Sequence, residues 1–223
     1  MQFRKAAFGF AVVAALLVMA QPAHAVVFNL TFEGLKDQES ILDFYNGGAG
    51  SQGSTGPNLG VSFGSGALAL IDADNGGTGN FANEPSGNTI AFWLASGGLV
   101  MNVAAGFDTG FSFFYTSSTA ATVTVYDGVN KTGNVIGTIQ LNANYNINCT
   151  GDPTGSFCHW DAVGVGFAGL AKSVDFGGTA NQTGFDNITF GSQTPTPTPT
   201  PEPTSLLLLG AGIVGLALAR RRS

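Results

Sequence analysis

Short segments in which apolar and polar residues alternate recur throughout the middle of this 223-residue chain. In the first of them Phe28, Leu30 and Phe32 alternate with polar neighbours. A period of two residues, with many β-branched and aromatic side chains, indicates strands with one apolar face. The chain is therefore predicted to be all-β. The predicted strands are residues 28–32, 61–63, 67–71, 90–94, 111–115, 121–126, 135–141, 163–167, 172–176 and 185–190.

The breaks between these segments are rich in Gly, Asn, Asp and Ser, which favour chain reversals. The Asp127-Gly128 pair is the clearest hairpin signal, although its loop continues to Gly133. Many short strands with closely spaced turns predict an antiparallel β-sandwich, most simply a jelly roll. A β-barrel is the alternative fold.

The first 25 residues have the features of a secretory signal peptide. The basic pair Arg4-Lys5 precedes an apolar run from Ala11 to Ala20, and Ala23-His24-Ala25 fits the cleavage pattern of small residues. We expect a signal helix that directs the chain to the secretion machinery and is removed after Ala25.

The other end of the chain contains an apolar run from Leu206 to Ala219. As a helix this run would be roughly 21 Å long, which is short for a hydrocarbon core of roughly 30 Å. The arginines that follow it place the C-terminus in the cytoplasm and the upstream domain outside. The residues around the run are the triplet Pro201, Glu202 and Pro203 and the cluster Arg220, Arg221 and Arg222.

This arrangement resembles the PEP-CTERM sorting signal of Gram-negative bacteria, over residues 201–223 with a hydrophobic helix at 204–219. The resemblance implies that an exosortase recognises the Pro-Glu-Pro triplet and cuts near it. The protein would then be held transiently in the inner membrane and delivered to the cell surface or the extracellular space. An ordinary single-pass anchor is the alternative interpretation of the same residues.

Between the two signals, residues 26–192 form the predicted β-sandwich domain and residues 193–203 a Thr/Pro-rich linker. Alternating prolines favour extended polyproline II, so the linker is expected to be an unpacked, semi-rigid stalk. The domain also resembles the jelly-roll domains common among PEP-CTERM proteins, which are generally taken to be surface or matrix proteins. This likeness is carried by residues 32–35, 44–48, 60–63, 106–107 and 185–191.

The predicted domain is strongly acidic. Residues 26–192 contain thirteen Asp and Glu residues and only three lysines, a net charge of −10. Every arginine lies in the terminal signals. A surface without a basic patch excludes nucleic acid as a partner, and its negative potential attracts cations.

Cys149 and Cys158 are the only cysteines of the chain. In an exported protein the expected outcome is a disulfide between them, closing a short loop. Two free buried thiols are the alternative.

The sequence predicts a structural calcium ion as the only cofactor. Glu33 follows the first strand and Asp186 lies near the start of the last strand, and these two strands are expected to pair antiparallel. Carboxylate oxygens are preferred calcium ligands, and a buried carboxylate needs a partner. Because Glu33 lies on the polar face of its strand, the pairing requires a bulge or a strand end.

The closing motif, residues 185–191, is also similar to the last strand of carbohydrate-binding jelly rolls, many of which hold calcium. Asp72 and Asp74, followed by glycines, are the alternative site.

Exposed aromatic rings would bind polysaccharide, and Trp93, Trp160 and Tyr45 are the candidates.

His159 is the only histidine between the two signals, and no spacing of acids selects a catalytic pair, so no enzyme activity is expected. The sequence predicts an exported structural or adhesive protein of the cell surface or extracellular matrix. A secreted protein that binds or degrades polysaccharide is the alternative.

Overall fold

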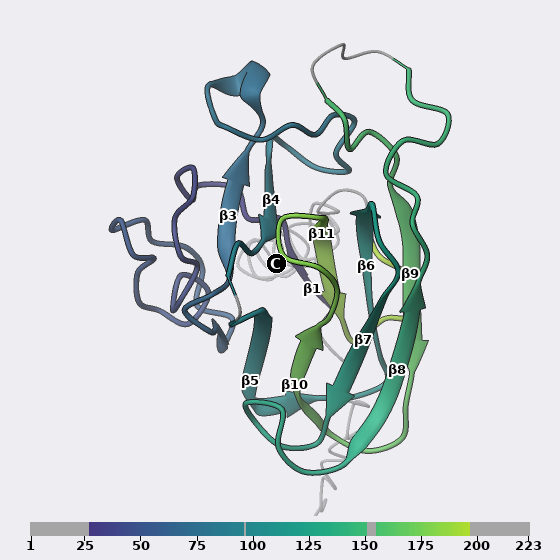
Figure 1. The fold of residues 1–223 in the computed structure, drawn as a ribbon. Helices are drawn as coiled ribbons and strands as arrows, with labels where there is room; N and C mark the ends of the chain where they lie inside the picture. Colours follow the sequence, from purple (N-terminus) through teal and green to yellow (C-terminus); the bar gives the residue numbers. More distant parts are fainter. Residues whose placement is uncertain (1–26, 96, 151–154, 197–223) are drawn as a thin grey trace, which may run out of the picture.

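The computed structural model describes residues 27–95, 97–150 and 155–196, and this part of the chain is all-β (Figure 1). Its strands form two sheets in which every strand pair is antiparallel. The first sheet has the order β3 (Leu68–Ile71), β4 (Thr89–Phe92), β11 (Thr183–Phe190), β6 (Gly110–Ser117) and β9 (Asp161–Gly166), with β1 (Phe28–Leu30) also paired to β11. The second has the order β2 (Val61–Phe63), β5 (Leu99–Phe107), β10 (Ala171–Phe176), β7 (Ala121–Tyr126) and β8 (Val135–Leu141).

The chain alternates between the two sheets from β4 onward, with only the β7–β8 hairpin staying in one sheet. The prediction of an all-β, antiparallel fold is confirmed, and two separate sheets agree with a sandwich better than with a barrel. The expected helices of the two signals lie outside the described residues. Within those residues no helix is long and apolar enough to cross a membrane, and one short 3₁₀ helix, η1 (Ala73–Asn75), is present.

Phenylalanine rings from both sheets meet in the main core. Phe176 of β10 packs against Phe185 of β11 at a ring distance of 4.8 Å and against Phe111 of β6 at 5.6 Å. All three side chains are fully buried. Burying a side chain of this size contributes roughly 1.5–3 kcal/mol, so these contacts hold the two sheets face to face.

A second apolar cluster covers the outer face of the first sheet. It contains Leu70, Phe81, Ile90 and Phe92, with Trp160 packed against it. The β3–β4 loop and the β8–β9 loop provide its cover, and both lie at the top in Figure 1. Both faces of β4 are therefore buried, which explains why all four of its residues are inaccessible.

One strand was not among those predicted. β5 reads Leu-Val-Met-Asn-Val-Ala-Ala-Gly-Phe, which lacks a clean alternation of apolar and polar residues. Its pairing with β10 and β2 makes it a central strand of the second sheet, buried on both faces over its first half. Tertiary contacts, which a local pattern does not contain, decide its structure.

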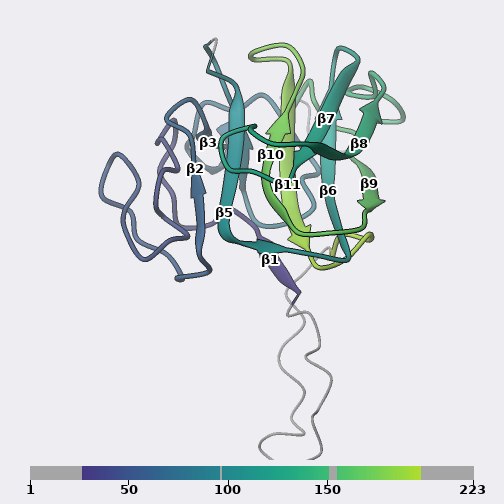
Figure 2. The same cartoon turned by 90° about the horizontal axis from the view of Figure 1, so that it is seen from below.

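The ends of the domain meet where β1 pairs with β11; in Figure 2, β1 lies at the lower edge of the sandwich and β11 in its middle. The structure corrects the expectation that the linker is unpacked from residue 193 onward. Residues 193–196 run back over the first sheet: Pro195 is buried, the Asn29 amide donates to the Thr196 carbonyl at 3.2 Å, and the Thr196 N–H donates to Thr189 Oγ1 at 3.4 Å. The domain thus extends at least to residue 196, and the rest of the predicted linker lies outside the described residues.

Glycines in the first sheet make this return path possible. A Cβ atom at Gly164 or at Gly166 would collide with Gln193, because the segment lies directly on the strand backbone. The Ser112 hydroxyl adds a hydrogen bond of 3.0 Å to the Ser192 carbonyl. We call residues 192–196 the docked segment.

Candidate functional site

The register of the terminal strands brings Glu33 and Asp186 into one region. β1 pairs antiparallel with β11, and Leu30 faces Ile188 in this ladder. β11 carries a bulge between Asp186 and Thr189, where Asn187 adopts a positive φ of 49°. Glu33 lies beyond the end of β1. The bulge and the strand end are the irregularities that the predicted pairing required.

A single loop binds both carboxylates. The Ser86 N–H donates to Asp186 Oδ2 at 2.8 Å, and its hydroxyl lies 3.0 Å from the same oxygen. Two residues later the N–H groups of Asn88 and Thr89 donate to Glu33 Oε1 at 3.0 and 2.9 Å. Gly87 between them has a φ of 49°, and a Cβ atom there would collide with the Glu33 carboxyl group.

Asp186 is completely buried. Burial raises the pKa of its carboxyl group to about 8, and the negative charge of Glu33 adds to this rise. Hydrogen bonds from Asn187 and Ser86 act in the opposite direction without cancelling it. The site can therefore hold either a proton on Asp186 or a cation beside two carboxylates.

Tyr45 closes the inner side of this site. Its hydroxyl accepts a 2.7 Å hydrogen bond from the Phe32 N–H, and its side chain is 3% exposed. Burial raises the pKa of this hydroxyl far above its usual value, and the charges of Asp186 and Glu33 contribute. Tyr45 thus stays neutral and fixes the chain just before Glu33.

The alternative acids belong to a helix cap. Asp72 is buried and caps η1, with its carboxylate accepting from the Asp74 N–H and the Asn75 amide at 3.4 Å. The Asp74 side chain is exposed. Capping of this kind stabilises a turn without any metal. No group of three or more His, Cys, Asp or Glu side chains that could hold a metal ion occurs in the described residues.

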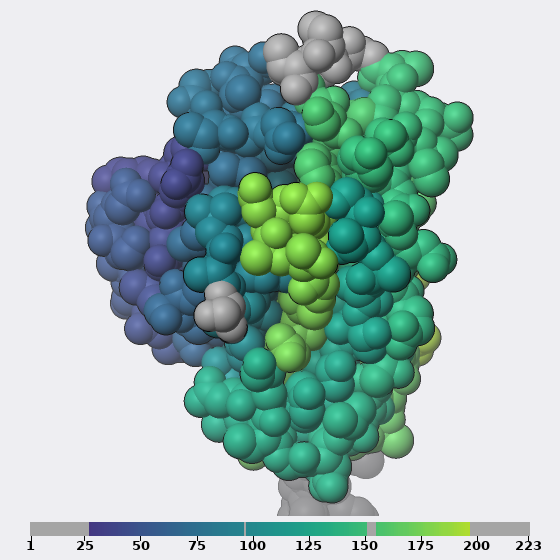
Figure 3. All heavy atoms as spheres, viewed as in Figure 1, coloured from purple at the N-terminus to yellow at the C-terminus, as the bar shows by residue number. Residues whose placement is uncertain are grey.

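Two of the three predicted sugar platforms are core residues. Trp93 is 4% exposed and stacks on Phe185 at 6.1 Å. The loop between β10 and β11, yellow-green at the centre of Figure 3, contacts Trp93 through Asn181, whose N–H donates to the Trp93 carbonyl. Tyr45 is buried against Phe44 at 4.8 Å. Neither ring offers a face to solvent, so the expectation is corrected for both. Trp93 faces the main core because Ile90 and Phe92 fill the second cluster instead.

Trp160, the third candidate, is half-buried. Its indole N–H donates to the Ala82 carbonyl at 3.0 Å, and its ring meets Phe81 edge to face at 6.3 Å. Trp160 therefore joins the loop before β9 to the loop before β4. This role is structural, and part of the ring remains accessible.

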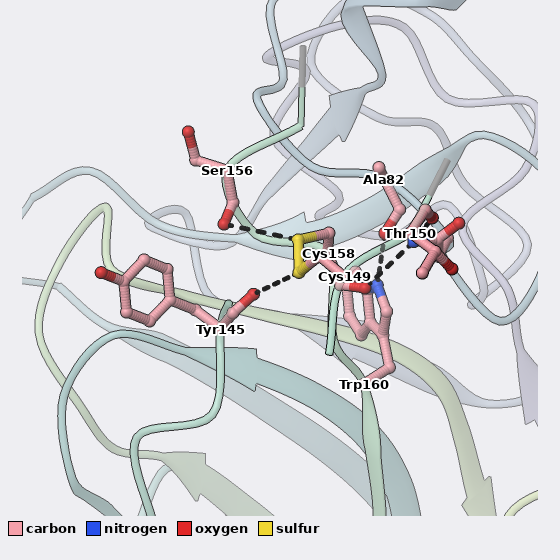
Figure 4. Close-up of a disulfide and its surroundings, with 8 residues drawn as sticks. Ala82, Tyr145, Cys149, Thr150, Ser156, Cys158 and Trp160 are labelled. Carbon is pink, nitrogen blue, oxygen red and sulfur yellow. Dashed lines mark hydrogen bonds between the residues drawn. A yellow bond between two sulfur atoms is a disulfide. The ribbon is translucent and has the colours of Figure 1, made fainter. Parts of the chain in front are cut away.

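The disulfide between Cys149 and Cys158 is present, with Cα atoms 5.4 Å apart (Figure 4). Both cysteines lie in the β8–β9 loop, so the bond cross-links this loop within itself. The Cys158 N–H donates to the Tyr145 carbonyl at 2.8 Å, and the Asn83 amide donates to the Cys158 carbonyl at 3.1 Å. Next to it, His159 Nε2 lies 3.1 Å from Asp161 Oδ1.

Sequence reasoning missed Ser86, the residue that binds the buried carboxylate. The Pro85-Ser86-Gly87-Asn88 stretch is a turn signal, but nothing in it indicates a partner 100 residues away. It also missed Glu39, whose carboxylate is completely buried and accepts from Lys36, Gln52 and Ser54.

A family profile described as "PEP-CTERM protein-sorting motif" matches residues 199–222. The chain carries a PEP-CTERM sorting motif. The match includes the Pro-Glu-Pro triplet and the three arginines, so the predicted resemblance is confirmed. A PEP-CTERM motif implies an exported protein that is anchored in the membrane before exosortase processes it. The motif itself lies outside the described residues.

Two solved structures resemble the PEP-CTERM protein only remotely. One is a glycoside hydrolase family 43 arabinoxylan arabinofuranohydrolase from Bacillus subtilis in complex with cellotetraose, with 17% identity and a TM-score of 0.37. The alignment covers 57% of this chain and 24% of the hydrolase, so the chain spans about a quarter of that protein. The other is the K2 cleaved adhesin domain of Lys-gingipain (Kgp), with 14% identity, a TM-score of 0.44, and coverage of 74% of this chain and 97% of that one. A comparison with curated proteins gave no match.

Proposed function

We propose that this PEP-CTERM protein is a structural or adhesive component of the cell surface or the extracellular matrix. The observation that carries the proposal is the sorting motif, which follows a folded, acidic β domain in the same chain. The motif implies exosortase as the processing partner. After processing, the β domain would reach the cell surface or the extracellular matrix.

The use of the acidic residues supports binding or structure rather than catalysis. Glu39 Oε1 accepts from the Gln52 N–H at 2.7 Å, and Glu39 Oε2 accepts from the Lys36 N–H at 2.8 Å. Burial raises the pKa of Glu39, but hydrogen bonds from Ser54, Lys36 and Gln52 outweigh it, and the pKa lies below its usual value. Asp37 likewise accepts from the Ile71 N–H at 2.9 Å. Asp37 thus ties the segment between β1 and β2 to β3, and Glu39 holds parts of that segment together.

The proposal includes a structural calcium ion between Glu33 and Asp186. Their carboxylates and the Ser86 hydroxyl offer the hard oxygen ligands that calcium prefers. A buried carboxylate beside a second negative charge is costly unless a cation or a proton compensates it. Backbone carbonyls and water would complete the six to eight ligands. The ion would tie the first strand, the last strand and the β3–β4 loop together.

Calcium binding is tested by thermal unfolding of the exported protein. Millimolar calcium should raise the melting temperature, because a ligand that binds only the folded state stabilises it. The Asp186→Asn protein should lose this response, and the Asp43→Asn protein, changed at an exposed acid, should keep it. A melting temperature that does not respond to calcium would remove the ion from the proposal.

The surface role is tested in cells that lack the gene. Cell cohesion and the amount of retained matrix should fall, and the full chain should restore both. A chain with alanines in place of Pro201, Glu202 and Pro203 should not restore them. Unchanged cohesion in the deletion strain would contradict the adhesive role.

A further inference from the structure

The second apolar cluster contains a pocket of about 30 Å³ on the outer face of the first sheet. Its walls include the rings of Phe81, Phe92 and Phe157. Thr116 of β6 lies at its base, and Asn80 and Asn181 lie at its rim. A volume of this size is above the roughly 10–15 Å³ that one water molecule occupies, so the pocket admits a hydroxyl or hydroxymethyl group.

The Thr116 hydroxyl is an unusual feature of this pocket. Thr116 is 1% exposed, and its Oγ1 is the only buried side-chain oxygen or nitrogen in the described residues without a hydrogen-bond partner. Leaving such a group unpaired costs about 1–3 kcal/mol. Its place at the base of a pocket that opens toward solvent indicates that a partner comes from outside the chain.

The rim supplies two further polar groups. Asn80 and Asn181 are exposed, and their backbone groups hold neighbouring loops: the Asn80 carbonyl accepts from the Phe157 N–H, and the Asn181 N–H donates to the Trp93 carbonyl. Within the described part of the chain neither side-chain amide forms a hydrogen bond. Thr183 also lines the pocket, but its hydroxyl is already bonded to Ser117. The Thr116 hydroxyl and the two amides are therefore the polar side-chain groups left for a ligand, and no charged residue lines the pocket.

The walls are held in place before any ligand arrives. Phe81 and Phe157 form a parallel bridge, and the Ala82 N–H donates to the Phe157 carbonyl at 3.1 Å. Phe157 also packs on Tyr145 at 5.3 Å, directly beside the disulfide of Cys158. The pocket is therefore preformed.

We propose that this pocket receives one hydroxyl or hydroxymethyl group of a neutral sugar residue in a polysaccharide. That group bonds to Thr116 Oγ1, the sugar ring stays outside at the rim, and the two asparagine amides bond to its neighbouring hydroxyls. Neutrality follows from the uncharged lining and from the domain's net charge of −10, which repels uronic acids. The inference rests on the proposed surface function and specifies its ligand class.

Calorimetric titration of the exported protein tests the subsite. The probes are maltotetraose, mannotetraose and laminaritetraose, with tetragalacturonate as the charged comparison. We expect at least one neutral probe to bind and tetragalacturonate not to bind. The Thr116→Val protein should bind that probe about tenfold more weakly or worse, a loss of about 1.4 kcal/mol. Its melting temperature should be equal or higher, because an unpaired buried hydroxyl is removed.

Matched variants keep the test decisive. Thr138→Val changes an exposed threonine of β8 and should bind like the wild type. Asn80→Ala changes an exposed rim residue and should weaken binding without unfolding the protein. No binding of any neutral probe, or equal binding by Thr116→Val, overturns the subsite. Because Thr116→Val leaves the sorting motif intact, a failed subsite with normal surface delivery leaves the proposed function standing.

Discussion

At the scale of single residues, Asp186 has the most unusual environment in the protein. It is completely buried, it forms no ion pair within the described residues, and its nearest charged neighbour is also an acid. The sequence predicted that Asp186 and Glu33 would meet, because the terminal strands of a jelly roll commonly pair antiparallel, and the apolar residues at 188 and 190 predicted that Asp186 is buried. It did not predict Ser86 or the hydroxyl of Thr116, since both depend on loops that pack across the sheet.

This environment makes stability depend on pH when calcium is removed. The pKa of Asp186 is about 8 in the folded protein, against about 3.9 in an unfolded chain. Between these values the folded state holds a proton that the unfolded state releases, so the free energy of unfolding falls as pH rises from about 4 to about 8. Each unit of pKa difference corresponds to about 1.4 kcal/mol.

Urea unfolding in a chelator at about pH 5 and about pH 8.5 measures this slope. The wild type should lose stability at the higher pH, and Asp186→Asn should show a smaller loss. Saturating calcium should also reduce the loss, since the proposed ion would compensate the ionised carboxylate. Identical slopes for the wild type and Asp186→Asn would show that Asp186 does not titrate in this way.

At the scale of elements, the disulfide constrains the β8–β9 loop. The pairing was predicted from export and from the presence of only two cysteines, and the structure adds that the cross-linked loop carries Phe157, which packs with Trp160 against the second apolar cluster. The burial of Trp93 could not be predicted, because a two-residue period does not tell which face is the core when both faces of β4 are covered.

Reduction should therefore lower the melting temperature. A closed loop of this length stabilises the protein by roughly 2–3 kcal/mol. A protein with serines at Cys149 and Cys158 should melt at the lower temperature with or without reductant, which serves as the control. If a strong reductant leaves the melting temperature of the wild type unchanged, the disulfide does not stabilise the protein.

The docked segment is the other element that composition alone does not reveal. Its Thr/Pro sequence predicts a stalk, but glycines of β9, far away in the sequence, leave room for it on the sheet. Gly164→Ala should displace Gln193 and destabilise the domain by about 1–3 kcal/mol. Gly137→Ala is the matched control, because its new Cβ would have ordinary contacts at 3.6 Å. Equal melting temperatures for the two variants would show that the segment does not contribute to stability.

At the scale of the whole molecule, local patterns predicted the all-β class, the antiparallel sheets and the pairing of the first strand with the last. They missed β5, whose contiguous apolar residues form a strand only because β2 and β10 flank it. The sorting motif was predictable in full, because it is a contiguous sequence that a membrane enzyme reads.

Mass spectrometry of protein taken from the cell surface tests the central claim, that the sorting motif delivers the β domain outside the cell. The account predicts peptides from residues 27–196 and no peptide containing Arg220, Arg221 or Arg222. A chain with alanines at Pro201, Glu202 and Pro203 should keep its C-terminal residues and stay in the inner membrane. Recovery of the uncut wild-type chain at the outer surface, or of the folded domain in the cytoplasm, would contradict the account.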